Sequence, residues 1–135
     1  MKHVLLALVI VLSFGREVQG QQGAAVEIEA VISQQMDAFQ GDDFGRAFDF
    51  AADNIRRMFG TPENFGEMVK RGYPMVHRSE DVRFGNLRQD GDALWQRVLV
   101  RDGAGVLFVL DYLMVPTVAG WRIAAVQMIS SEESA

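Results

Sequence analysis

The stretch "ALWQRVLVRDGAGVLFVLDYLMV", residues 93–115, decides the fold of this chain because it predicts two long β-strands joined by a tight turn. Side chains of different polarity alternate over Ala93–Arg101, and a second apolar segment covers Val106–Val115. The sequence Gly103-Ala104-Gly105 separates them, which is typical of a short hairpin loop. The stretch therefore predicts an antiparallel hairpin with one face toward a core.

The register of this hairpin determines which side chains face inward. With a three-residue loop whose glycine takes the left-handed conformation, Gln96 lies opposite Tyr112 and Arg97 lies opposite Asp111. The alternative two-residue loop at Gly103-Ala104 would place Asp111 beside Gln96 and turn Arg97 inward, because a slip of one residue reverses every side chain. The first register buries fewer charges, so we predict an Arg97–Asp111 pair on the outer face and an uncharged inner face.

The remaining strands lie on either side of this hairpin in the sequence. They are predicted at Asp81–Leu87, at Trp121–Ile129 and, as a short strand, at Met75–His77. A two-residue Val118-Ala119 turn pairs Tyr112 with Ala125 in the last hairpin. The predicted inner face then carries Gln96, Tyr112, Trp121, Ile123, Ala125 and Gln127.

The first half of the chain predicts helices. Apolar residues recur at steps of three and four over Ala24–Gln40, which is the spacing of a buried helical face. The pair Asp42-Asp43 offers the cap of a second helix, and a turn follows at Asn54–Phe59. Thr61-Pro62 begins another helix, with Gly72 as its C′ residue. Helices followed by strands predict an α+β fold, with the helices packed on one face of an antiparallel meander.

The N-terminus is typical of a secretory signal peptide. Lys2 and His3 precede an apolar run, Val4–Leu12, which is too short to cross a bilayer as a helix. We predict a signal peptide over residues 1–20, a single domain over residues 24–129 and a polar tail over residues 130–135. The protein is then exported to a bacterial periplasm or secreted, and it is held at a membrane only if the N-terminal segment is uncleaved.

Composition excludes several classes of function. The net charge is −5 and no basic stripe is present, which argues against nucleic acid as a partner. The chain has no cysteine, so it has no disulfide and no thiol chemistry. His77 is the only histidine after the signal peptide, which argues against a His-rich zinc site and weakens the case for a Ser-His-Asp triad. We therefore predict no metal and no cofactor.

A long pattern resembles a known family. It runs "QQMDAFQGDDFGRAFDFAADNIRRMFGTPENFGEMVKRGYPMV" over residues 34–76, followed by Gln96, Tyr112 and "GWRI" at Gly120–Ile123. Over Ile28–Met128 this is similar to the bacterial family named domain of unknown function 4864, which implies no activity and no catalytic residues. The chain also resembles the nuclear-transport-factor-2-like (SnoaL-like) superfamily. That resemblance implies a cone, with helices in the concave face of a curved sheet, whose cavity holds an enzyme site, a ligand or a protein partner in different members.

We consider three functions. The first is non-catalytic binding of a small apolar ligand or a protein partner in the cavity, through Gln96, Tyr112, Trp121, Gln127, Phe65, Met68 and Tyr73. The second is an isomerase, dehydratase or hydrolase that uses Tyr112 as a donor with Asp37, Asp43 or His77 as the acid or base. The third is a structural scaffold that forms a homodimer through the outer sheet face at Trp95, Arg97 and Leu99.

The two inward glutamines leave a further choice open. Gln96 and Gln127 sit among apolar neighbours in the predicted register, and a buried amide needs hydrogen-bond partners. They either orient a bound ligand, or hydrogen-bond Tyr112, the backbone or buried water.

Overall fold

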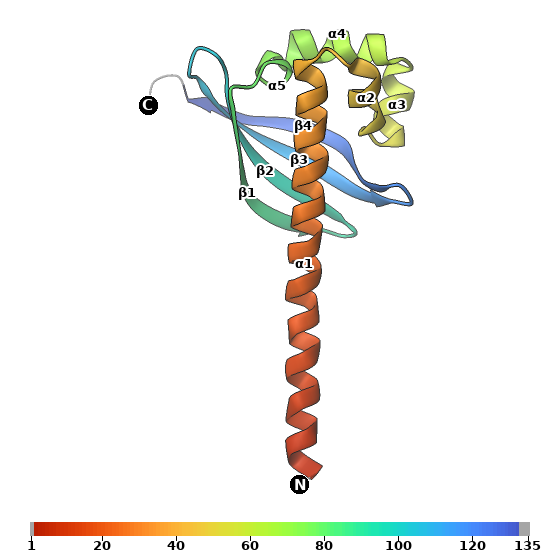
Figure 1. The fold of residues 1–135 in the computed structure, drawn as a ribbon, viewed down its shortest axis with the longest axis vertical. Helices are drawn as coiled ribbons and strands as arrows, with labels where there is room; N and C mark the ends of the chain where they lie inside the picture. The colour runs from red at the N-terminus through yellow and green to blue at the C-terminus, as the bar shows by residue number, and fades with distance from the viewer. Residues whose placement is uncertain (1, 133–135) are drawn as a thin grey trace.

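A computed structural model describes residues 2–132 of the chain, with side chains described over residues 20–130. Five helices precede a four-stranded antiparallel sheet of order β1-β2-β3-β4, as Figure 1 shows. The elements are α1 (Lys2–Gln40), α2 (Phe44–Asp49), α3 (Asp53–Phe59), α4 (Pro62–Gly72), α5 (Pro74–His77), β1 (Asp81–Asp90), β2 (Ala93–Arg101), β3 (Leu107–Thr117) and β4 (Gly120–Glu132). This arrangement confirms the predicted α+β class.

The β2–β3 hairpin has the predicted register. Gln96 pairs with Tyr112 and Arg97 pairs with Asp111. Gly105 has a φ of 82°, the left-handed conformation that the three-residue loop requires. The side chain of Asp102 tightens the loop, because its Oδ1 accepts from the N–H groups of Ala104 and Val106, each at 3.0 Å.

The sequence predicts the wrong register for β4 after the first residues of this strand. The turn at Val118-Ala119 is as predicted, since Thr117 pairs with Gly120, but Tyr112 pairs with Val126 and not with Ala125. A bulge between the pairs Met114–Ile123 and Leu113–Ala125 inserts one extra residue, Ala124, and reverses the faces that follow it.

The segment between α2 and α3 holds β4 at this bulge. Ala52 donates its N–H to the carbonyl of Ile123 at 2.8 Å, and Ile123 donates its own N–H to the carbonyl of Phe50 at 2.9 Å. Asn54 Nδ2 donates to the carbonyl of Ala124 at 2.9 Å. Backbone groups of β4 at the bulge are thereby satisfied by the α2–α3 segment and the start of α3, which lie far away in the sequence.

The helical half differs from the prediction at three places. Asn54–Phe59, predicted as a turn, belongs to the helix α3. Gly72 is the last helical residue of α4 and not a C′ residue in the left-handed conformation; Tyr73 follows as the C-cap with a φ of −136°. Met75–His77, predicted as a short strand, forms the helical turn α5, because Pro74 is well placed at the start of a helix.

The core lies between the inner face of the sheet and the helices. Figure 1 shows α1 crossing one face of the sheet and extending beyond it toward the N-terminus, with α2 to α5 gathered near the C-terminal end of α1. From the sheet, Val98, Val100, Leu110, Tyr112 and Met114 are fully buried, and α1 contributes Ile28, Ile32, Met36 and Phe39. Asp111 is also buried, but on the outer face.

The N-terminal and C-terminal predictions fall at the limits of the described structure. The helix α1 runs from Lys2 through the segment predicted as a signal peptide, residues 1–20, and the side chains of residues 1–19 lie outside the described structure. β4 continues to Glu132, into the segment predicted as a polar tail, and residues 133–135 are not described. Among the helices of the described part, none has the length and apolar character needed to cross a membrane.

Candidate functional site: an apolar cavity between the helices and strand β4

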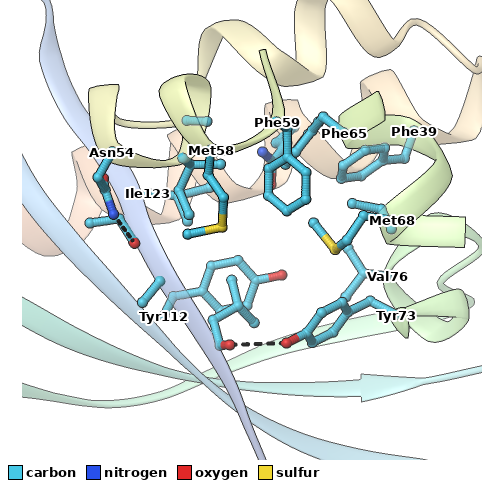
Figure 2. A pocket seen from close by; sticks show the side chains of 17 residues that line it. Phe39, Asn54, Met58, Phe59, Phe65, Met68, Tyr73, Val76, Tyr112 and Ile123 are labelled. Carbon is cyan, nitrogen blue, oxygen red and sulfur yellow. Dashed lines mark hydrogen bonds between the residues drawn. The ribbon is translucent and has the colours of Figure 1, made fainter. Parts of the chain in front are cut away.

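A cavity of about 310 Å³ lies between the helices and the strands β3 and β4. Figure 2 shows it from close by, with Phe59 and Phe65 above, Met68 to the right and Tyr112 below. It is lined by Gln35, Phe39, Ala51, Asn54, Ile55, Met58, Phe59, Phe65, Met68, Val69, Tyr73, Val76, Tyr112, Ile123, Ala124, Ala125 and Val126. No acidic side chain, histidine, lysine or arginine is among these 17 lining residues.

Helix α4 forms one wall of the cavity, and its sequence explains how it is placed. Thr61 caps the helix as predicted: its Oγ1 accepts from the N–H of Asn64 at 3.1 Å, and Pro62 takes the first helical position. Asn64 Nδ2 in turn donates to the carbonyl of Phe59 at 3.0 Å, which ties α4 to the end of α3. The amphipathic spacing then turns Phe65 toward the cavity.

Two tyrosine hydroxyls supply polar groups inside the cavity. The side chain of Tyr112 is buried, and its hydroxyl has no hydrogen-bond partner among the described residues. Burial raises the pKa of Tyr112 far above its ordinary value, with a smaller contribution from Tyr73, so the hydroxyl stays neutral and keeps its proton. The hydroxyl of Tyr73 donates to the carbonyl of Val126 at 3.1 Å.

Two amide side chains complete the polar lining. Gln35 is buried, and its Nε2 donates to the carbonyl of Ala47 at 3.0 Å. Asn54 Nδ2 donates to the carbonyl of Ala124 at the β4 bulge. Met58 lies where the cavity meets solvent, since it lines the cavity and is 70% exposed. The cavity is thus apolar and uncharged, with few polar groups.

Removal of the hydroxyl is expected to affect the free energy of unfolding differently at the two tyrosines. Tyr112→Phe should leave the free energy of unfolding of the ligand-free protein unchanged, or raise it by up to about 1 kcal/mol, because it removes a buried polar group without a protein partner. Tyr73→Phe should lower the free energy of unfolding by about 1 kcal/mol, because the carbonyl of Val126 loses its donor. Urea unfolding of both variants measures the difference. A clear loss of stability in Tyr112→Phe would contradict an unpartnered hydroxyl.

The structure brings four of the predicted ligand-binding residues together. Phe65, Met68, Tyr73 and Tyr112 all line the cavity. The others do not line it, for three separate reasons that concern Gln96, Trp121 and Gln127.

Gln96 faces inward but is used by the backbone. Its Nε2 donates to the carbonyls of Gly85 at 3.0 Å and Arg97 at 2.9 Å, at the place where β1 bulges. Gln127 was predicted on the inner face, but the bulge at Ala124 carries it to the outer face, where it pairs with Asp111 and is exposed. Trp121 packs against the core at the start of β4, away from the cavity.

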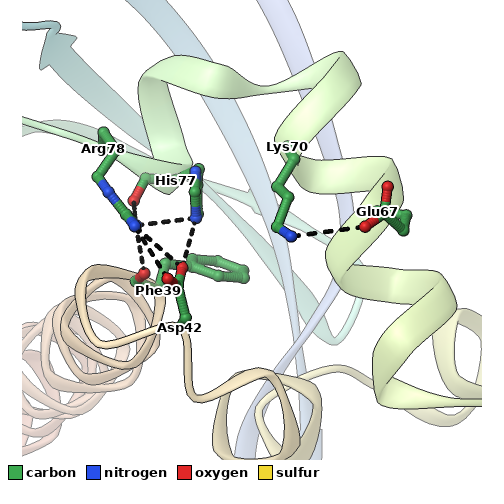
Figure 3. A network of polar contacts seen from close by, with 6 residues as sticks. All are labelled: Phe39, Asp42, Glu67, Lys70, His77 and Arg78. Carbon is green, nitrogen blue, oxygen red and sulfur yellow. Dashed lines mark hydrogen bonds and ion pairs between the residues drawn. The ribbon is translucent and has the colours of Figure 1, made fainter.

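The acids and the histidine of the enzyme hypothesis do not line the cavity. Asp37 is exposed on α1. Asp43 is the N-cap of α2, where its Oδ1 accepts from the N–H of Arg46 at 3.2 Å. His77 lies in a separate polar network with Asp42 and Arg78, drawn in Figure 3.

This network joins the end of α1 to α5. Arg78 donates from Nη1 to the carbonyl of Phe39 at 2.7 Å and from Nη2 to both carboxylate oxygens of Asp42, at 3.0 and 3.1 Å. His77 Nε2 lies 2.8 Å from Asp42 Oδ1, and hydrogen bonds from His77 and Arg78 hold the pKa of Asp42 below its ordinary value. Asp42 has a φ of 53°, so the network also holds a turn that a residue with a side chain rarely adopts. Its contacts are those of a structural clamp.

Comparisons with known proteins give the family. Residues 21–135 match the family described as Domain of unknown function (DUF4864). The chain belongs to this family. No curated protein and no solved structure matches it. Within the part of this DUF4864 domain that the structure describes, no three His, Cys, Asp or Glu residues are placed to hold a metal ion.

The cavity of this DUF4864 domain is lined in part by residues that the sequence did not predict to lie there. Asn54, Ile55 and Phe59 come from α3, and their spacing of one and four residues is a helical signal that was available in the sequence. Val126 was missed because the β4 bulge leaves no clear mark in the sequence.

Proposed function

We propose that this DUF4864 domain binds a small, neutral, mainly apolar molecule in its cavity and does not catalyse a reaction on it. The observation that carries the proposal is an uncharged apolar cavity of about 310 Å³ into which a buried hydroxyl without a protein partner projects. This volume lies at the lower end of the range for small-molecule sites, about 300–1,000 Å³. Apolar walls with a few placed polar groups are the usual composition of such sites.

The alternative of an isomerase, dehydratase or hydrolase has weaker support. Such chemistry needs an acid or base within hydrogen-bond reach of the bound molecule. Tyr112 is a neutral donor, but Asp37, Asp43 and His77 are all outside the cavity lining. Binding therefore accounts for the geometry with fewer assumptions.

Two further proposals complete the functional picture. We propose export to the periplasm or secretion through residues 1–20, as the sequence pattern predicts.

We also propose that the domain forms a homodimer through Trp95, Arg97 and Leu99. Supporting it, these side chains lie on the outer sheet face with part of their surface exposed, and Trp95 and Leu99 are not packed against the core.

A neutral fluorescent probe tests the binding proposal. N-phenyl-1-naphthylamine, which brightens in apolar surroundings, is expected to bind the wild-type protein at one site. Val126→Phe places a larger side chain in the cavity lining and is expected to weaken binding by about tenfold or more, since the added ring takes cavity volume.

The matched control is Val118→Phe, the same substitution at a fully exposed turn. It should leave the affinity within about twofold. Circular dichroism and thermal unfolding establish that both variants are folded. Equal affinity for the two variants, or no probe binding by the wild type, would reject the proposed function.

A further inference from the structure

The hydroxyl of Tyr112 marks where the polar end of a ligand belongs. The Tyr112 side chain is 1% exposed, its hydroxyl has no partner among the described residues, and Figure 2 shows it projecting into the cavity. A buried hydroxyl without a partner costs about 1–3 kcal/mol, so a ligand atom that accepts its proton gains from a group already in place. The ligand should therefore carry an acceptor at this point.

A second tyrosine faces the same region with the opposite hydrogen-bonding capacity. Tyr73 projects from the wall formed by α4 and α5 toward the end of the cavity that holds the Tyr112 hydroxyl (Figure 2). Its proton is used in the bond to the carbonyl of Val126 at 3.1 Å. The oxygen of Tyr73 therefore offers lone pairs only, since a phenol has one donor and further acceptor capacity. Tyr112 is thus the free donor and Tyr73 is an acceptor.

The lining excludes charged ligands. None of the 17 lining residues carries a formal charge at neutral pH, so a carboxylate or an ammonium group would lose its hydration without a counter-charge. The ligand must be neutral where it meets the tyrosines.

A hydroxyl group satisfies both tyrosines. It accepts from Tyr112 and donates to Tyr73, whereas a ketone or an ether accepts but cannot donate. Resting on the proposed binding function, we propose that the cavity is specific for apolar alcohols or phenols, whose hydroxyl lies between Tyr112 and Tyr73 and whose hydrocarbon part packs against Phe59, Phe65 and Met68.

The test compares four probes of the same shape that differ in one group. They are 4-tert-butylphenol, 4-tert-butylanisole, tert-butylbenzene and 4-tert-butylbenzoate, each measured at pH 7 by displacement of bound N-phenyl-1-naphthylamine. The phenol should bind the wild-type protein about threefold to tenfold more tightly than tert-butylbenzene, as one net hydrogen bond allows. The anisole should fall between them, and the benzoate should bind weakest.

The variant Tyr112→Phe separates the hydroxyl from the shape of the cavity. In this variant the phenol should lose about threefold to tenfold in affinity, while tert-butylbenzene should stay within about twofold of its wild-type value. In this variant the phenol should bind no more tightly than tert-butylbenzene. Its hydroxyl still loses hydration on entering the cavity, but it no longer gains the hydrogen bond from Tyr112.

The outcomes distinguish the two proposals. If the fluorescent probe binds but the phenol is no tighter than tert-butylbenzene, or if the phenol keeps its preference in Tyr112→Phe, the alcohol specificity is wrong and cavity binding stands. Tightest binding of the benzoate would also overturn the specificity. If the fluorescent probe does not bind the wild type at all, both proposals fail.

Discussion

Phe65→Ala is expected to lower the free energy of unfolding by about 3–5 kcal/mol, the largest effect of any single substitution that we propose. Phe65 is 5% exposed and lies at the centre of an aromatic cluster. Its ring centroid is 6.0 Å from that of Phe39, 5.3 Å from that of Phe48 and 5.9 Å from that of Phe59. One ring thus joins α1, α2, α3 and α4.

The loss in unfolding free energy should exceed the transfer free energy of the removed apolar atoms. Phe65 already borders the cavity, so alanine would enlarge an existing space, and residual volume adds to the cost. The neighbouring Gly66 limits how far α4 can shift, because a Cβ at this position would lie 2.7 Å from the ring of Phe44. The helix is therefore closely packed on one side and cannot move freely to fill the gap.

Urea unfolding of the wild type and Phe65→Ala measures this loss. Met58→Ala is the control, because Met58 borders the same cavity but is 70% exposed; its loss should be about 0.5 kcal/mol or less. A loss below about 1.5 kcal/mol in Phe65→Ala would show that the aromatic cluster does not hold the helical layer.

Local sequence signals predicted those parts of the fold that depend on neighbouring residues. The β2–β3 register follows from one glycine-containing loop and from the cost of burying Arg97, and the structure has it. The start of α4 follows from Thr61-Pro62 in the same way. These signals also placed Tyr112 and Phe65 on the inward side, which is most of what is needed to find the cavity.

Tertiary contacts decided the parts that the sequence could not predict. The bulge at Ala124 is held by Asn54, whose partner carbonyl is 70 residues away in the sequence. A one-residue shift of this kind moved Val126 to the cavity and Gln127 to solvent, because side chains alternate along a strand. Gln96 shows the same limit: its face was correct, but the β1 bulge that occupies its amide was not visible in the sequence.

Asp111→Asn is expected to lower the free energy of unfolding by about 2–3 kcal/mol at pH 7. The carboxylate is 5% exposed and accepts from Arg97 Nε at 2.8 Å, Arg97 Nη2 at 3.0 Å and Arg88 Nη2 at 2.9 Å. Gly85 permits this arrangement, since a Cβ there would lie 2.9 Å from Cγ of Arg97. An asparagine would leave two partly buried guanidinium groups without a counter-charge.

The pH dependence of the same variant gives an independent check. The hydrogen bond from Arg97, and to a smaller extent Arg88, lowers the pKa of Asp111 from 3.8 to about 2 despite its burial. Because the folded-state pKa is the lower one, the stabilisation of about 2 kcal/mol is complete above pH 4 and is lost as the pH falls from 4 to 2. The difference in unfolding free energy between wild type and Asp111→Asn should therefore begin to narrow below pH 4.

Asp81→Asn is the matched control, because Asp81 pairs with Arg83 at 3.0 Å with both side chains exposed, by 48% and 78%. Asp81→Asn should lower the free energy of unfolding by about 0.5 kcal/mol or less. If Asp111→Asn were equally mild, or if its difference from the wild type stayed constant from pH 5 to pH 3, the three-residue charge cluster would add nothing to stability. A large and pH-dependent loss would instead identify Asp111 as a residue that stabilises the sheet from its outer face, which explains a buried acid that the cavity does not use.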